Sequence, residues 1–225
     1  MNWSKVIRNN QEAEDAELKE LIDSRVGFYD SADLAIGTHS ILCEYNKFLN
    51  EEIFNQWMLI LNELDIIHPM VLYSMANTGI TVDVKCAFLI ESFEGLAELI
   101  ASKNSKYKIP EKRKGESHLG NCVKSIINLY GMDIFDKEME KKEEGFISVL
   151  VNSRNRIAHI KSKNGKRVLN GTESILYSIK LSYLYRVVLF SLLGIGYSEY
   201  SNKLKESVSQ WNDWENVLNN LLLEL

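Results

Sequence analysis

Apolar residues recur through most of the chain at intervals of three and four positions, which is the repeat of a helix with one buried face. Such patterns predict helices over residues 12–22, 46–64, 118–130 and 145–160. The clearest stripe begins after Thr81 and consists of Val82, Cys86, Leu89, Phe93, Leu96 and Ile100. No segment shows the strict alternation of a half-buried strand, so the pattern predicts an all-α protein.

Residues 174–196 form the most apolar stretch, and Thr172 or Ser174 is expected to cap its helix. Its length would suit a membrane span, but Lys180 and Arg186 lie inside it, and a charge near the centre of a bilayer is costly. We therefore expect the central helix of a bundle, which is apolar on most sides because neighbouring helices surround it.

The remaining segments have weaker patterns. Pro69 interrupts the chain between the helix over 46–64 and the helix after Thr81. The charged run 136–144 is expected to be the solvated start of a helix. A last amphipathic helix is expected to begin at Ser201, and the apolar residues on one of its sides are Leu204, Val208, Trp211, Leu218 and Leu222.

The chain contains only 2 Pro and 12 Gly, so the helices are expected to be long. Connectors are expected at 27–37, at 77–79 and around Pro110. The architecture that fits is an up-down bundle of about four core helices with additional flanking N- and C-terminal helices. Residues 1–80 would form an N-terminal helical extension, and residues 81–225 would form the bundle with a C-terminal helix.

The composition indicates the cellular compartment of the protein and whether it needs a cofactor. The three cysteines lie 43 and 36 residues apart, so they form no CxxC motif and are expected to be reduced, buried thiols. The N-terminus is polar and acidic and lacks the apolar segment of a secretory signal, which favours the cytoplasm. No spacing of histidines suggests metal ligands, so neither a metal nor another cofactor is expected.

Residues 153–159 contain the candidate chemistry, because Arg154 is followed directly by Asn155 and five positions later by His159. On a helix with 100° per residue, Arg154 lies between two apolar arcs and His159 lies about 140° away from it. The two side chains are therefore not neighbours on the helix surface. Ala158 and Asn155 leave a shallow surface between them, over which a phosphate group would fit.

Arginine binds phosphate through a planar, permanently charged fork, and histidine exchanges a proton near neutral pH. Metal-free cleavage of RNA needs such groups, because the RNA supplies its own 2′-hydroxyl nucleophile. Arg154 and His159 are therefore candidate catalytic residues. The structural alternative is an ion pair of Arg154 with Glu91 or Glu94 on the helix after Thr81, with His159 only capping its helix.

The net charge of −5 is unevenly distributed along the chain. Residues 103–114 and 154–167 contain twelve basic residues against one acidic residue, a net charge of +11, which leaves −16 for the rest of the chain. This distribution is typical of a polyanion site on an otherwise acidic protein. The second stretch contains the motif, and its candidate RNA-binding residues are Arg156, Lys161, Lys163, Lys166 and Arg167.

Tyrosines crowd into the apolar helix and the segment after it. Aromatic rings of this kind can stack on nucleobases, but packing in the bundle explains most of them more simply. The residues concerned are Tyr177, Tyr183, Tyr185, Tyr197 and Tyr200.

These features together resemble the HEPN superfamily, and most closely the HEPN domain of ApeA-like prokaryotic endoribonucleases, which are associated with abortive infection. The matching pieces are residues 88–96 (FLIESFEGL), residues 151–159 (VNSRNRIAH) and the long apolar helix that follows. The resemblance covers residues 82–200 and does not extend to the first 80 residues.

The resemblance implies a metal-independent endoribonuclease that acts as a homodimer, with motifs from two protomers facing one composite cleft. Arg154 would bind the scissile phosphate, His159 would be the acid/base group, and Asn155 would orient one of them. The products would be a 2′,3′-cyclic phosphate and a 5′-hydroxyl. It further implies a toxin or anti-phage defence effector that cleaves RNA such as tRNA, partnered by an antitoxin or a fused sensor domain.

Two other functions remain open at this point. One is a non-enzymatic helical dimerisation or sensing module, and the other is RNA binding without cleavage. An open cleft that contains both Arg154 and His159 would favour the nuclease. A buried Arg154 paired with Glu91 or Glu94 would favour the module.

Overall fold

The computed structural model describes residues 42–43, 50–76, 79–105, 107–111, 117–159, 165–210 and 214–225. The chain divides into two compact units, Met1–Ala35 and Ile36–Leu225. The first unit lies outside the described residues, and with it the helix expected over 12–22. The division expected at residue 80 stays a prediction.

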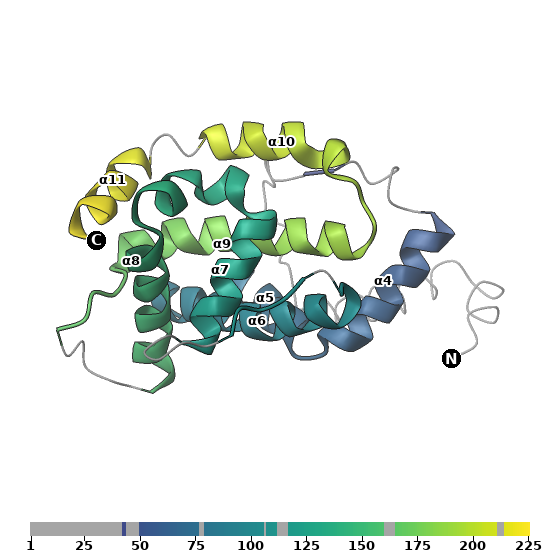
Figure 1. The fold of residues 1–225 in the computed structure, drawn as a ribbon, viewed down its shortest axis with the longest axis horizontal. Coiled ribbons are helices and arrows are strands. Elements are labelled where there is room, and N and C mark those ends of the chain that lie inside the picture. Colours follow the sequence, from purple (N-terminus) through teal and green to yellow (C-terminus); the bar gives the residue numbers. More distant parts are fainter. Residues whose placement is uncertain are drawn as a thin grey trace. The chain divides into compact units, whose positions relative to one another are not determined.

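The described part of the chain contains eight helices and no strand, which confirms the all-α prediction (Figure 1). They are α4 (Glu51–Leu64), α5 (Ile67–Met75), α6 (Val82–Lys103), α7 (His118–Tyr130), α8 (Met132–Ala158), α9 (Gly171–Leu192), α10 (Tyr197–Ser209) and α11 (Glu215–Glu224). Helix α6 packs against α5, α7, α8 and α9, and α10 and α11 pack against α8. The bundle is therefore organised around α6, α8 and α9.

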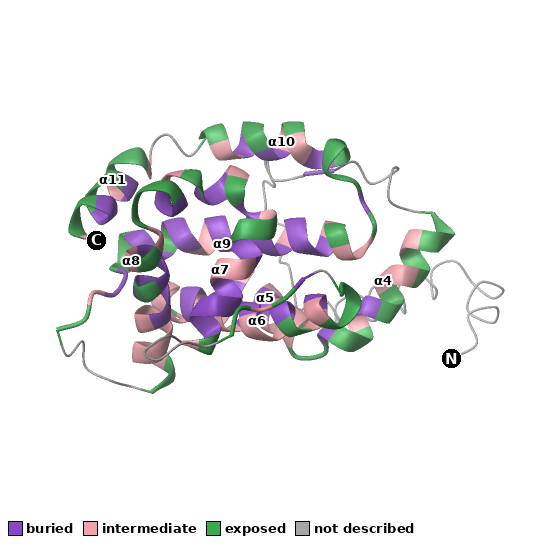
Figure 2. Cartoon of the chain, viewed as in Figure 1, coloured by how far each residue is buried: buried purple, intermediate pink, exposed green. Residues whose placement is uncertain are grey.

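Helix α9 is the most enclosed element of the bundle, as the purple ribbon in Figure 2 shows. It is the only described helix that is long and apolar enough to cross a membrane. Its apolar side chains are instead covered by α6 and the other helices packed on it, as expected of a central helix.

The α9 cap differs from the expected one. Asn170, rather than Thr172 or Ser174, caps the helix, since its side chain accepts a hydrogen bond from the Glu173 backbone N–H at 3.0 Å. The Glu173 carboxylate in turn accepts one from the Asn170 N–H at 2.7 Å, which completes a capping box. Ser174 is instead buried inside the helix.

Three other boundaries were predicted incorrectly. Pro69 does not separate helices but lies in the first turn of α5, where its missing N–H has no intrahelical partner to lose. The charged run 136–144, expected to start a helix, and the helix expected over 145–160 form one helix, α8, which begins at Met132 and has a non-helical backbone at Phe135 and Lys142. Glu138 in this run is buried rather than solvated. Ser201 lies inside α10. The single helix expected from Ser201 onward is two helices: α10 ends at Ser209 and α11 begins at Glu215. Residues 211–213 between them lie outside the described ranges.

A buried charge pair joins α8 to α9. The Lys180 ammonium donates to the Glu138 carboxylate, and the Tyr177 hydroxyl donates to the same Glu138 oxygen at 3.1 Å. Glu138 has no exposed surface, and the Lys180 Nζ lies 5.1 Å from the centroid of the Phe135 ring. Burial lowers the pKa of Lys180, although the charge of Glu138 opposes this.

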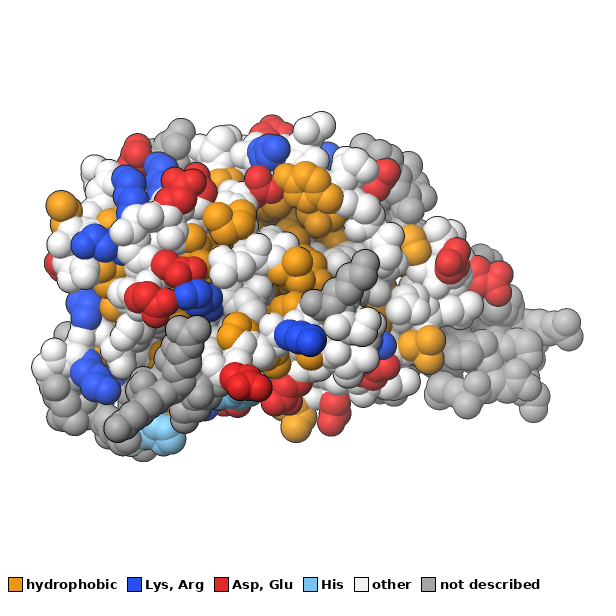
Figure 3. Space-filling model, viewed as in Figure 1, with side chains coloured by type: hydrophobic (Ala, Val, Ile, Leu, Met, Phe, Trp, Pro, Cys, Tyr) orange, Lys and Arg blue, Asp and Glu red, His pale blue; other side chains and the backbone are white. Residues whose placement is uncertain are grey.

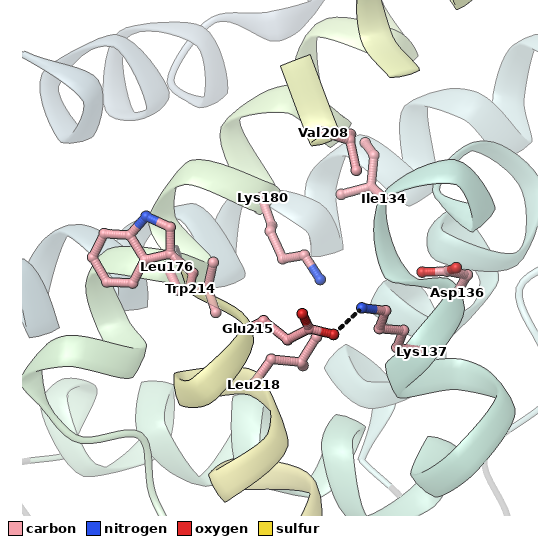
Figure 4. A pocket seen from close by; sticks show the side chains of 9 residues that line it. All are labelled: Ile134, Asp136, Lys137, Leu176, Lys180, Val208, Trp214, Glu215 and Leu218. Atoms are coloured by element: carbon pink, nitrogen blue, oxygen red, sulfur yellow. Dashed lines mark hydrogen bonds and ion pairs between the residues drawn. The ribbon is translucent and has the colours of Figure 1, made fainter. Parts of the chain in front are cut away.

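Lys180 also extends into a cavity of about 70 Å³ between α8, α9, α10 and α11 (Figure 4). At its rim, Lys137 on α8 pairs with Glu215 on α11 at 3.1 Å. The cavity is of the size of a few water molecules and is too small for a metabolite. The pair of Lys180 and Glu138 therefore has a structural role.

Removing one member of this pair should destabilise the protein strongly, because the other charge stays buried without a counter-ion. We expect Lys180→Met to lower the free energy of unfolding by roughly 3–5 kcal/mol, measured by chemical denaturation followed by circular dichroism. The double variant Lys180→Met/Glu138→Leu should recover most of this loss.

Lys137→Met is the matched control, since it removes a solvent-exposed pair and should change stability by less than about 1 kcal/mol. Equal stabilities of Lys180→Met and Lys137→Met would contradict the structural role of the buried pair.

Candidate functional site

The motif lies at the C-terminal end of α8. Helical hydrogen bonding ends at Ala158, and the His159 backbone N–H donates to the Asn155 carbonyl at 3.1 Å. Arg156 lies in this last turn, where a positive charge complements the helix dipole. The chain then continues into the basic connector that leads to α9.

Arg154 forms a two-point ion pair with Glu91 on α6. Its Nε and Nη2 donate to the two carboxylate oxygens of Glu91, so the planar fork of the arginine faces the planar carboxylate. The Arg154 side chain keeps 20% of its surface exposed, and that of Glu91 keeps 37%. The hydrogen bonds with Glu91 raise the pKa of Arg154, and the charge of Glu94 adds to this.

The ion pair does not use all the donors of Arg154. Its Nη1 donates to the Asn155 side-chain oxygen at 2.9 Å, which makes three N–H groups engaged. A guanidinium has five N–H donors, so two of them, one on each Nη, are left for a further acceptor. Glu91 and Asn155 thus fix the orientation of the arginine and leave part of its fork available.

His159 stands apart from this cluster. It caps α8, is exposed, and makes no side-chain hydrogen bond or ion pair with another described residue. Five residues along a helix correspond to about 7.5 Å and about 140°, so Arg154 and His159 do not meet directly. The structure therefore brings together Arg154, Asn155 and Glu91, and it leaves His159 on its own at the helix end.

The basic connector is only partly available for a ligand. The Arg167 guanidinium pairs with Glu173 on α9 and with Glu224 on α11 at 2.8 Å, so it ties the connector to two helices. Arg156 is half-buried and Lys166 is exposed, and neither has an ion pair among the described residues. Lys161 and Lys163 lie outside the described residues.

Ser153 and Asn152 position the connector and were not expected to matter. The Ser153 hydroxyl donates to the Val149 carbonyl at 2.7 Å and accepts from the Leu169 N–H at 2.8 Å. The Asn152 side chain donates to the Arg167 carbonyl at 3.4 Å. A serine on the core stripe of a helix was the signal in the sequence, because a buried hydroxyl needs partners.

Metal ligands are not gathered at the motif. Among the described residues, no three His, Cys, Asp or Glu side chains are placed to hold a metal ion. The Cys122 thiol, which lies 3.6 Å from the His118 ring, is fully buried, and burial raises its pKa to about 12. It is therefore a neutral packing thiol rather than a nucleophile.

A sequence profile of the Apea-like HEPN family matches residues 87–199, half of the chain. The chain belongs to the Apea-like HEPN family. The match includes Glu91, Arg154 and His159, and it runs from α6 into the start of α10. No curated protein and no solved structure matches the chain. Membership of this HEPN family indicates an RNA-related role in defence.

The variant Glu91→Gln should measure how much the ion pair of Glu91 with Arg154 contributes to the stability of the HEPN bundle. Because both side chains are partly exposed, solvent screens the pair, and we expect a loss of about 1 kcal/mol in the free energy of unfolding. Glu94→Gln, one helical turn away and with no hydrogen bond to Arg154, is the matched control and should cost less than half as much. Equal losses in urea denaturation would show that the pair does not connect α6 to α8.

Proposed function

We propose that this protein is a metal-independent endoribonuclease of the HEPN type, acting in defence against phage or as a toxin. The observation that carries the proposal is the end of α8. There Arg154 is held in a fixed orientation with two N–H donors left over, and the exposed His159 and the basic connector follow it at the end of the same helix.

The reaction would proceed by attack of the RNA 2′-oxygen on the adjacent phosphorus. A base takes the 2′-hydroxyl proton, the P–O5′ bond breaks, and an acid protonates the leaving 5′-oxygen. The products are a 2′,3′-cyclic phosphate and a 5′-hydroxyl. The remaining N–H groups of Arg154 would bind the phosphate as negative charge develops, and His159 would act as the acid or the base.

The separation of Arg154 from His159 supports a homodimer as the active form. Because Arg154 and His159 lie about 140° apart around the same helix end, a phosphate held by the fixed Arg154 fork remains open to a histidine that approaches from a second copy. In a composite cleft, the partner subunit's His159 would supply the missing group. Asn155 would then keep Arg154 turned toward the shared phosphate.

A cleavage assay with two histidine variants tests this proposal. We expect the protein to cleave labelled tRNA or mixed RNA in the presence of EDTA, and His159→Ala to lower the rate at least about 100-fold. His118→Ala is the matched control, since His118 also lies at the end of a helix and is partly exposed, but on α7. Replacing the scissile nucleotide by its 2′-deoxy form should abolish cleavage.

Cleavage that survives His159→Ala would contradict the proposed mechanism. So would products that carry a 3′-hydroxyl, because that end requires water rather than the 2′-hydroxyl as the nucleophile. A fused sensor domain or an antitoxin would act upstream of this chemistry, so the assay is run with the isolated chain and with infected-cell extract added.

The second candidate function is a non-catalytic helical dimerisation or sensing module. The ion pair of Arg154 with Glu91 favours it, because a structural arginine would be held in the same way. In that case Arg154→Ala would lower stability to the same extent as Glu91→Gln, and no variant of the motif would change an RNA signal. The same variants therefore distinguish the two functions: a nuclease loses RNA cleavage, whereas a structural module loses only stability.

RNA binding itself is tested by salt dependence. Each phosphate contact on single-stranded RNA adds about 0.7 to the slope of log affinity against log salt. The variants Arg156→Ala and Lys166→Ala should each lower that slope, measured by fluorescence anisotropy. Lys141→Ala, an exposed lysine in α8 far from the motif, should leave it unchanged. Identical slopes for all three would place the RNA elsewhere.

A further inference from the structure

Helix α11 places an acidic side chain in a hollow of the basic connector. The hollow has a volume of about 450 Å³, and its walls are Gly165, Lys166, Arg167, Val168, Asn170 and Glu224. Of these described residues only Glu224, at the end of α11, is acidic. Figure 3 shows Lys and Arg side chains on the side of the bundle where α11 and the connector lie. The Glu224 carboxylate therefore lies where the connector would otherwise offer a site to another anion.

The hollow adjoins the motif through the last turns of α8. The Asn152 side chain donates to the Arg167 carbonyl at 3.4 Å, and the Ser153 hydroxyl accepts from the Leu169 N–H at 2.8 Å. These two bonds hold the connector against the residues that directly precede Arg154 in the chain. A nucleic-acid strand that occupies the motif therefore has neighbouring phosphates near the hollow.

The two acidic partners of Arg167 are held differently. The Arg167 Nη2 donates to Glu173 at 2.5 Å, and the Glu173 side chain keeps only 4% of its surface exposed. The buried Nε lies 2.8 Å from the Glu224 Oε2 without an aligned hydrogen bond, and the Glu224 side chain is 60% exposed. The third nitrogen, Nη1, donates to the Val168 carbonyl. Arg167 therefore keeps its orientation without Glu224, and Glu224 is the partner that an anion from solvent can replace.

Helix α11 is attached to the bundle by a small contact. Only three of its ten residues are buried, and they are Leu218, Leu221 and Leu222. Beneath its start lies the cavity of about 70 Å³ beside Lys180, so the helix does not close fully on α8 and α9 there (Figure 4). Its other ion pair, of Glu215 with Lys137, is exposed to solvent and contributes little. A helix with so little buried surface opens at a lower free energy than the bundle unfolds.

We propose that α11 is a displaceable latch on the connector, in which the Glu224 carboxylate occupies the place of an RNA phosphate at Arg167. The inference rests on the proposed function, since it concerns how RNA gains access to the same site. When RNA binds, a phosphate replaces Glu224 beside the Arg167 Nε, and α11 leaves α8 and α9. The closed form then binds RNA more weakly than the open form, by the free energy needed to detach α11.

Binding of a labelled, single-stranded 2′-O-methyl RNA, followed by fluorescence anisotropy, tests this inference. Such RNA lacks the 2′-hydroxyl nucleophile, so the result does not depend on cleavage. Leu221→Asn should detach α11 by placing an amide in its apolar contact, and Glu224→Gln should remove the competing carboxylate. Each variant is expected to bind the RNA about fivefold more tightly than the wild type.

Each variant has a matched control. Leu223→Asn makes the same substitution on α11, at a side chain that is 85% exposed. Glu140→Gln removes one exposed carboxylate in the N-terminal half of α8, away from the connector. Both controls should bind the RNA within about twofold of the wild type. Thermal melting shows whether Leu221→Asn keeps the bundle folded. Glu224→Gln changes only an exposed side chain and provides the same test if it does not.

Hydrogen exchange of the wild type distinguishes displacement of α11 from simple charge repulsion. The backbone amides of residues 215–224 should exchange faster when the RNA is bound, because α11 has left the bundle, whereas those of α6 should not. A protein that fails the cleavage assay but shows this gain in affinity and exchange has the latch and is not a nuclease, so the two failures are distinguishable.

The inference is overturned if Leu221→Asn and Glu224→Gln bind the RNA no more tightly than their controls, or if bound RNA leaves exchange in α11 unchanged or slower. It is also overturned if no variant binds the RNA.

Discussion

Covering α9 is the constraint on which the rest of the bundle depends. This helix carries apolar side chains on nearly every side, so it is stable in water only when other helices surround it. Helices α6 and α8 provide two of the covering surfaces. Helix α6 packs on α9 and also directly on α8, and the contact between α6 and α8 places Glu91 beside Arg154. The arrangement of the motif is therefore a consequence of how the core is closed.

The ion pair of Arg154 with Glu91 has two physical consequences. It stabilises the contact between α6 and α8, as a structural ion pair would. It also limits the arginine to one orientation before any ligand arrives, which reduces the entropy lost on binding a phosphate. The negative charge of Glu91 weakens the local attraction for RNA at the same time. A phosphate would then depend on further cations, such as Arg156 and Lys166, to be held at this end of α8.

Much of the fold was predictable from periodicity, because the apolar stripes of α6 and α7 are long and unambiguous. The helix boundaries that failed depend on local contacts. Asn170 became the cap of α9 because Glu173 three residues later completes the capping box, whereas Thr172 was nearer to the apolar run. The interruptions of α8 at Phe135 and Lys142 are not visible in a periodic pattern, which contains no information on how α8 packs against α9 and α11.

The sequence allowed the residues of the site to be predicted, but not the side chains with which they form ion pairs. The spacing of Arg154 and His159 gave their separation around the helix, and Glu91 was one of two acidic candidates for the ion pair. The choice between Glu91 and Glu94 depends on how α6 is rotated against α8, which only the assembled bundle determines. The role of Arg167 was hidden for the same reason, since Glu224 lies 57 positions later in the chain.

Helix α8 carries the motif at its C-terminal end and the buried Glu138 near its N-terminal end. Its 27 residues would span about 40 Å if straight, with Asp133 near one end and Arg154 near the other. The non-helical residues Phe135 and Lys142 divide it, so the segment with Asp133 is set off by kinks from the segment that carries the motif. Coupling between the two ends requires a second arrangement of α8, and these interruptions are where such an arrangement would differ.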